Sequence, residues 1–75
     1  MIIQDEMLRA AIARTLQIEE ADITEKKLEE LMTLSARSSG IISLEGLQYA
    51  VNLKYLDLCG NAIEDLTPIR DLREI

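Results

Sequence analysis

The apolar residues of this chain follow one pattern near the N-terminus and a different pattern from about residue 31 onward. In residues 5–17 they recur at the three- and four-residue spacing that forms one stripe along an α-helix. That stripe consists of Leu8, Ala11, Ile12 and Leu16. Asp5 stands just before it, and an aspartate there caps the free backbone N–H groups of a first helical turn. We therefore expect a helix over residues 5–17 that begins at an Asp5 cap.

A second, shorter helix is predicted after an acidic connection. Residues 18–23 carry three carboxylates and lack a helical stripe. Thr24 is a suitable N-cap, and Leu28 and Leu31 follow at the spacing of one inward-facing stripe. These residues predict a helix over roughly residues 25–30.

From Leu31 onward the apolar positions repeat at an offset of 22 residues, while the residues between them differ. The first set is Leu31, Leu34, Ala36, Ile41, Leu44, Leu47 and Ala50, and the second is Leu53, Leu56, Leu58, Ile63, Leu66, Ile69 and Leu72. Leucines at this spacing, with a period of about 20–29 residues, are the signature of leucine-rich repeats. Each such repeat adds one strand and one turn to a solenoid.

The second repeat indicates how one coil is built. Residues 55–58 alternate between polar and apolar side chains, as a half-exposed strand does. Asn61 follows three residues later, where its side-chain amide can bind backbone groups of adjacent coils. The first repeat has Ser39 in the place of Asn61 and Ala36 in the place of a leucine, and such departures are typical of a terminal repeat beside a cap.

The fold that these patterns predict is α/β: a leucine-rich repeat solenoid fragment with an N-terminal helical cap and short parallel strands of 22-residue repeats. Residues 1–30 form the cap, and residues 31–75 form two repeats and the start of a third. The helical stripe of the cap should pack on the N-terminal side of the first coil. The apolar side chains of the second coil should all be buried against the first coil, namely Leu56, Leu58, Ile63, Leu66 and Ile69.

Composition and charge exclude several classes of function. The chain has 75 residues, a formal net charge of −6, no His and one cysteine. Its eight basic residues are scattered, whereas a phosphate-binding surface needs clustered Lys and Arg, so we expect no nucleic-acid partner. The absence of His excludes His-based catalytic triads and mixed Cys/His zinc sites. No apolar run reaches the roughly 18 residues of a transmembrane helix, so we expect no membrane insertion.

The remaining candidate chemistry does not indicate an enzyme. Cys59 lacks a His or a positively charged setting that would activate a thiol, and we interpret it as a small residue packed at a coil edge. The densest acidic cluster shows no EF-hand pattern, and we interpret it as a solvated loop. It consists of Glu19, Glu20, Asp22 and Glu25. No glycine-rich phosphate loop occurs. We therefore expect neither a catalytic activity nor a cofactor or bound metal ion.

Three short runs together resemble the internalin-type leucine-rich repeat proteins of bacteria. They are Gly-Leu-Gln-Tyr at 46–49, Asp-Leu-Cys-Gly-Asn at 57–61 and Asp-Leu-Thr-Pro-Ile at 65–69. The resemblance covers about residues 5–75, and it implies a curved solenoid that binds a protein partner through a concave sheet. It also implies a protein that is secreted or displayed on the cell surface. Family members have more repeats and a C-terminal flanking domain, so we expect the chain to be a fragment of a longer protein.

The outward-facing residues of the two strands are the candidate partner-binding site. On the concave face these are Thr33, Ser35, Arg37, Lys54, Tyr55 and Asp57. Stacking at a strand spacing of about 4.8 Å would place them in two neighbouring rows. Tyr55 and Arg37 are the strongest candidates, because tyrosine and arginine are enriched at interfaces. An ordinary solvated strand face is the alternative interpretation.

Two other functions stay open on the sequence alone. The chain could be a purely structural cap that seals and nucleates the solenoid, or a cytoplasmic leucine-rich repeat scaffold or regulator whose Met1 is native. The second coil would also present an apolar flank and an unpaired strand edge. Because terminal repeats need a polar outer face for solubility, we expect self-association through this uncapped C-terminal edge.

Overall fold

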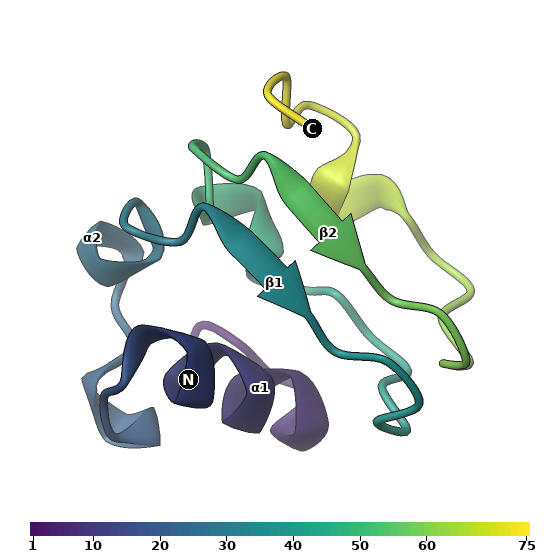
Figure 1. The fold of residues 1–75 in the computed structure, drawn as a ribbon, viewed down its shortest axis with the longest axis horizontal. Helices are drawn as coiled ribbons and strands as arrows, with labels where there is room; N and C mark the ends of the chain where they lie inside the picture. Colours follow the sequence, from purple (N-terminus) through teal and green to yellow (C-terminus); the bar gives the residue numbers. More distant parts are fainter.

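Two helices precede two short strands in a computed structural model that describes all residues 1–75 (Figure 1). The helices are α1 (Glu6–Leu16) and α2 (Glu25–Leu28), and the strands are β1 (Thr33–Ser35) and β2 (Tyr55–Asp57). Three 3₁₀ turns lie at Glu20–Asp22, Leu47–Tyr49 and Thr67–Ile69. None of the helical segments has the length and apolar character that a membrane span requires.

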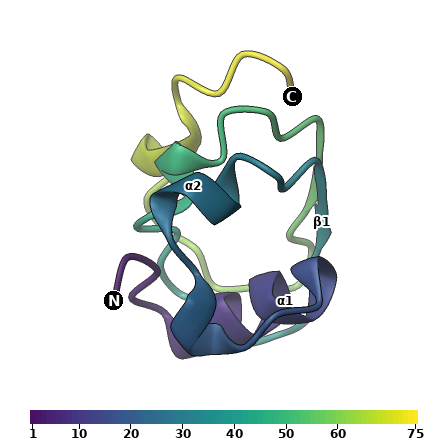
Figure 2. The same cartoon turned by 90° about the vertical axis from the view of Figure 1, so that its left-hand side faces the viewer.

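The part of the chain after α2 runs twice around a similar path. We call residues 31–52 the first coil and residues 53–74 the second coil. Each coil passes through its strand on one side of the molecule and returns through a 3₁₀ turn on the opposite side, as the side view in Figure 2 shows. Helix α1 lies against the first coil on the side away from the second coil (Figure 1).

Helix α1 begins at the Asp5 cap that the sequence predicts. The Oδ1 atom of Asp5 accepts hydrogen bonds from the backbone N–H groups of Met7 at 2.9 Å and Leu8 at 3.1 Å. The Oδ2 atom accepts from the backbone N–H groups of Ile42 at 2.9 Å and Ser43 at 3.1 Å, both in the first coil. One carboxylate therefore caps α1 and also ties it to a loop 37 residues away.

These four hydrogen bonds set the charge state of Asp5. Desolvation by partial burial opposes ionisation, but the bonds from the backbone of Ile42, Leu8, Ser43 and Met7 outweigh it and hold the pKa of Asp5 below its ordinary value of 3.8. A lowered pKa in the folded state stabilises the fold above the ordinary value, and this contribution is lost as the pH falls through the lowered value.

We expect Asp5→Asn to reduce the free energy of unfolding by about 1–3 kcal/mol at pH 7, because an amide cannot supply acceptors to all four N–H groups. The difference from the wild-type chain should shrink as the pH falls below 3.8 toward the lowered pKa of the folded carboxyl, because the unfolded chain takes up a proton first. Urea unfolding followed by circular dichroism at pH 7 and pH 3 measures both effects. A difference that is the same at both pH values would show that the carboxylate charge is not used.

Helix α2 is shorter than the sequence predicts. Thr24 caps it as expected, since its Oγ1 atom accepts from the backbone N–H of Lys27 at 3.1 Å. The helix ends at Leu28, and the next turn tightens so that the N–H of Leu31 donates to the carbonyl of Leu28 at 3.1 Å. Such a tight last turn ends the helix and leads the chain into β1. Leu28 and Leu31 are both fully buried, as predicted.

Strands β1 and β2 form a two-stranded parallel sheet. Thr33 pairs with Tyr55, Leu34 with Leu56 and Ser35 with Asp57, so every pair joins residues 22 positions apart. The backbone N–H of Ala36 donates to the carbonyl of Asp57 at 2.9 Å and extends the ladder beyond the strands. The register is therefore the offset that the apolar pattern of the sequence contains.

One aliphatic core runs from α1 into the first coil. Its 13 buried members are Ile3, Leu8, Ala11, Ile12, Leu28, Leu31, Leu34, Ala36, Ile41, Leu44, Leu47, Ala50 and Leu53. Leu16 is partly buried against this cluster. The predicted packing of the α1 stripe on the first coil is confirmed. The cluster includes all seven apolar positions of the first repeat, so that inward set is also confirmed.

The prediction that the second coil is buried in the same way is wrong. Leu56, Leu58, Ile63 and Ile69 are only partly buried, and Leu66 is 60% exposed. The physical reason is that the first coil covers them from one side and no segment of the chain covers them from the other. The second coil therefore presents a partly apolar outer flank, with a shallow hollow lined by Leu66, Thr67, Ile69 and Arg70.

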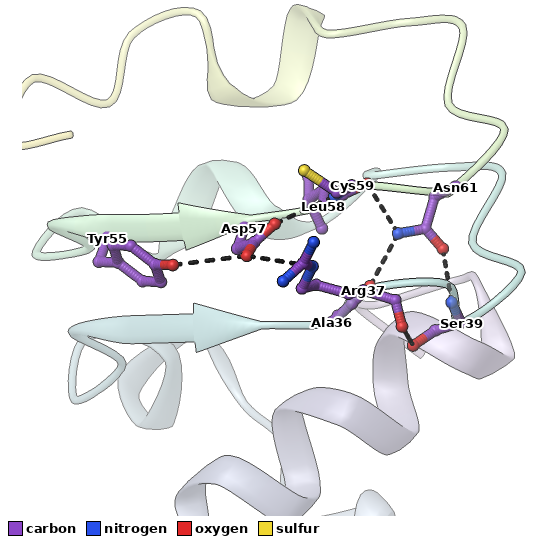
Figure 3. A network of polar contacts seen from close by, with 8 residues as sticks. All are labelled: Ala36, Arg37, Ser39, Tyr55, Asp57, Leu58, Cys59 and Asn61. Carbon is purple, nitrogen blue, oxygen red and sulfur yellow. Dashed lines mark hydrogen bonds and ion pairs between the residues drawn. The ribbon is translucent and has the colours of Figure 1, made fainter.

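Asn61 joins the two coils at the end of the sheet (Figure 3). Its side-chain nitrogen donates to the carbonyls of Ala36 at 2.7 Å and Leu58 at 2.9 Å. Its side-chain oxygen accepts from the backbone N–H groups of Ser39 at 2.9 Å and Ile41 at 3.0 Å. The predicted role of this asparagine, binding backbone groups of adjacent coils, is confirmed.

Gly46 allows the N-terminal segment to lie against the first coil. Its φ of +102° is in the left-handed region, and a Cβ atom there would overlap the carbonyl oxygen of Ile2. The close approach places the next residue, Ile3, in the core with 1% of its surface exposed. Only glycine tolerates both the positive φ and the close approach of Ile2, which explains why the run at 46–49 begins with glycine.

Candidate functional site: the strand face

The outer side of the sheet carries the residues that the sequence singles out for partner binding. Thr33 and Ser35 on β1 are exposed on either side of the buried Leu34. On β2, Tyr55 is 54% exposed and Asp57 is half-buried. The strand register places Thr33 beside Tyr55 and Ser35 beside Asp57. These four residues therefore form two neighbouring rows. We call these four residues, together with Arg37 and Lys54, the strand face.

Arg37 and Lys54 lie at opposite ends of the strand face, and both are exposed. Arg37 follows the end of β1, and its guanidinium group reaches Asp57 on the neighbouring strand. Lys54 directly precedes β2, and its backbone N–H donates to the carbonyl of Met32 at 2.8 Å. The Lys54 ammonium group forms no ion pair within the chain. The structure thus brings five of the six candidate residues onto or beside the sheet rows and places Lys54 at their border.

Asp57 is the centre of a polar network on this face (Figure 3). Its Oδ2 atom lies 3.5 Å from Nε of Arg37 and accepts a hydrogen bond from the Tyr55 hydroxyl at 3.4 Å. Its Oδ1 atom accepts from the backbone N–H of Cys59 at 3.1 Å. Both carboxylate oxygens are therefore used by groups of the chain itself.

The network keeps Asp57 ionised. Hydrogen bonds from the backbone and then the side chain of Cys59 lower the pKa of Asp57 below its ordinary value of 3.8, and they outweigh desolvation. The positive charge of Arg37 and the hydroxyl of Tyr55 lower this pKa further. The carboxylate is consequently charged throughout the neutral and mildly acidic range.

Two features of the site do not follow from the sequence reasoning. Cys59 is exposed, so its interpretation as a packed residue is wrong; the turn after β2 directs it to the surface. The central role of Asp57 was also missed. The sequence does contain a feature that predicts the contact between Arg37 and Asp57. Arg37 aligns with Cys59 at the 22-residue offset, so it stands diagonally across from Asp57 on the neighbouring strand, within reach of this opposite charge.

The acidic residues elsewhere do not form a second site. No group of three or more His, Cys, Asp or Glu side chains is arranged to hold a metal ion. Within the acidic connection, Glu20 accepts from Nε of Arg9 at 3.1 Å, and Nη1 of Arg9 donates to the carbonyl of Ile3 at 3.0 Å. This contact ties the connection to α1 and to the N-terminal segment.

Comparison with known proteins shows which family this chain belongs to. A scan against protein-family models and a search of curated proteins find no match. Among solved structures, an internalin (inlF) from Listeria monocytogenes is 33% identical at a TM-score of 0.91, over 99% of this chain and 22% of that chain. An internalin C2 (inlC2) from the same organism is 37% identical at a TM-score of 0.91, over 99% of this chain and 34% of that chain. The chain is an internalin-type leucine-rich repeat.

This internalin-type chain also resembles part of a structure described as the CBM51-2 and INT domains of Clostridium perfringens ZmpB. The two are 33% identical at a TM-score of 0.88, over 97% of this chain and 15% of that chain. The internalin-type chain thus spans between 15% and 34% of the length of the solved chains it matches. Its helix and its two-stranded parallel sheet are the features it shares with the internalins.

Proposed function

We propose that this chain is a protein–protein recognition module that binds its partner through the strand face. The observation that carries the proposal is the pair of side-by-side rows, in which mainly exposed side chains stand on strands anchored by the buried Leu34 and the partly buried Leu56. Such an arrangement holds recognition residues rigidly while leaving them free to vary. The internalin likeness supports a protein partner rather than a catalytic function.

The parent of this chain, in our proposal, is a bacterial leucine-rich repeat protein that is secreted or displayed on the cell surface. The likeness to proteins of Listeria monocytogenes and Clostridium perfringens supports this location. We also propose that the two coils belong to a solenoid of 22-residue repeats, which is supported by strand partners 22 positions apart. Two strands are narrow for an interface of about 800 Å² per partner, so further repeats would widen the same face.

Double replacement of Tyr55 and Arg37 by alanine tests the recognition role. We expect binding to be lost while the melting temperature changes little, because both side chains are mostly exposed. Proteins retained by the immobilised wild-type chain and by the double variant are compared by mass spectrometry. Arg70→Ala is the matched control, since the Arg70 side chain is 72% exposed and its ion pair with Asp71 lies in the last turn. A partner retained equally by all three chains would contradict the proposal.

A second function, sealing the end of the solenoid, is proposed for residues 1–30, with residues 31–75 as the repeats. It is favoured by the Asp5 carboxylate, which binds both α1 and the first coil, and by the burial of Leu8 and Ile12 in the core of that coil. The two functions are compatible, because the cap covers the side of the first coil that faces away from the second coil.

The outer flank of the second coil supports a further prediction, self-association through the C-terminal edge. The flank combines the exposed Leu66 with four partly buried aliphatic side chains and an unpaired edge of β2. Unpaired strand edges and apolar terminal coils favour association. Sedimentation should show a growing dimer fraction as the concentration rises to hundreds of micromolar. Added salt should favour the dimer slightly, because it screens the net charge of −6. A strict monomer throughout would contradict this prediction.

A further inference from the structure

One carboxylate on the strand face holds the two side chains best suited to contact a partner. The Asp57 side chain is 17% exposed, whereas the Arg37 side chain beside it is 65% exposed. Asp57 therefore lies lower on the surface, and Tyr55 and Arg37 project from either side of it (Figure 3). Tyrosine and arginine are also among the residue types that are enriched at binding hot spots.

The contact with Asp57 leaves most of the Arg37 guanidinium free. Arginine carries five N–H donors in a planar fork, and only the Nε side of this fork faces Asp57. The two Nη groups form no hydrogen bond within the chain. The ion pair thus favours one direction of the fork before a partner arrives, which reduces the side-chain entropy that binding would cost.

The free groups on this face are mainly hydrogen-bond donors and positive charges. Both oxygens of Asp57 are occupied, while the Nη groups of Arg37 and the ammonium group of Lys54 are not paired. The strand face therefore carries two basic residues against one acidic residue, in a chain with a net charge of −6. The complementary group must be an acceptor with negative charge. A single carboxylate fits better than a phosphate dianion, because the charge of the whole chain repels a dianion more strongly.

We propose that the Arg37 fork binds an aspartate or glutamate side chain of the partner protein, with the Tyr55 ring packed beside it. Asp57 is the positioning residue: it orients Arg37 and Tyr55 and does not itself contact the acidic group. This inference rests on the proposed recognition function and adds to it the chemistry of the partner. A planar fork matches a carboxylate through two parallel N–H···O bonds, which lysine cannot form.

The positioning role is tested without a partner, by NMR of the Nε–H group of Arg37 in the full chain. We expect this resonance to be resolved in the wild-type chain and to move to the position of a free arginine in Asp57→Asn. That variant keeps an oxygen for the Cys59 N–H, so the turn should persist. Asp65→Asn is the matched control, because Asp65 likewise accepts from a backbone N–H two residues on, that of Thr67, away from the strand face. A wild-type resonance already at the free position would overturn the positioning role.

The partner chemistry is tested by selecting a phage-displayed library of random 12-residue peptides on the immobilised wild-type chain. We expect the selected peptides to be enriched in Asp or Glu, and to bind at least about tenfold more weakly to Arg37→Ala and to Arg37→Lys, since a bidentate contact contributes more than about 1.4 kcal/mol. Arg70→Ala should bind as the wild type does. Peptides that need the strand face but show no acidic preference would overturn this inference and leave the proposed function standing. Peptides insensitive to every strand-face substitution would contradict the proposed function itself.

Discussion

Replacing Leu34 with alanine is expected to remove a large share of the free energy of unfolding of this chain. Leu34 is the central residue of β1, it is 1% exposed, and it belongs to the core shared by α1 and the first coil. Truncating a fully buried leucine costs about 2–5 kcal/mol. A chain of 75 residues has a total stability of only about 4–11 kcal/mol by the usual scaling per residue. Urea unfolding followed by circular dichroism measures the loss.

Leu66→Ala is the matched control for this prediction. Leu66 occupies the outer flank of the second coil and is 60% exposed, so its truncation should cost less than about 1 kcal/mol. The stability losses of these two leucine-to-alanine variants thus distinguish a buried position in the first coil from an exposed position on the outer flank of the second. Equal losses of unfolding free energy at the two positions would mean that the second coil is covered in solution. Sedimentation would then be expected to show self-association.

Asn61→Ala is expected to be the most damaging polar substitution, with a loss of about 3 kcal/mol. The amide binds four backbone groups, and its removal leaves part-buried carbonyls and N–H groups without partners. Asn52→Ala is the control, because the Asn52 amide is exposed and makes one bond, to the carbonyl of Glu29 at 2.8 Å. That loss should be about 1 kcal/mol. If the two variants were equally stable, Asn61 would not join the coils as the structure indicates.

Asn61→Asp separates the two halves of this contact. A carboxylate still accepts from Ser39 and Ile41, but it cannot donate to Ala36 and Leu58 and would repel their carbonyls. We therefore expect a loss at pH 7 that is at least as large as that of the alanine variant. Part of the stability should return near pH 3, where the protonated acid regains one O–H donor. Unfolding midpoints at the two pH values measure this return.

The local elements follow from short-range patterns. The helical stripe with Asp5 and Thr24 as caps, the strand at Tyr55–Asp57 and the position of Asn61 are all confirmed by the structure. They could be predicted because caps, strand alternation and turn asparagines act within a few residues of each other, so the sequence alone contains the physical cause. The register of the sheet was equally accessible, since two copies of one pattern pair most easily at their own offset.

What only the tertiary structure decided is how each residue is used once the coils are stacked. The same apolar pattern is fully buried in the first coil and partly exposed in the second, because α1 and the second coil cover the first from both sides. Asp5 binds a loop 37 residues away, and Asp57 joins Tyr55 to an arginine on the other strand. Burial and polar contacts of this kind depend on which surfaces meet in space. The sequence by itself determined the path of each coil, and the packing of the coils against each other and against α1 determined the core and the polar contacts of the strand face.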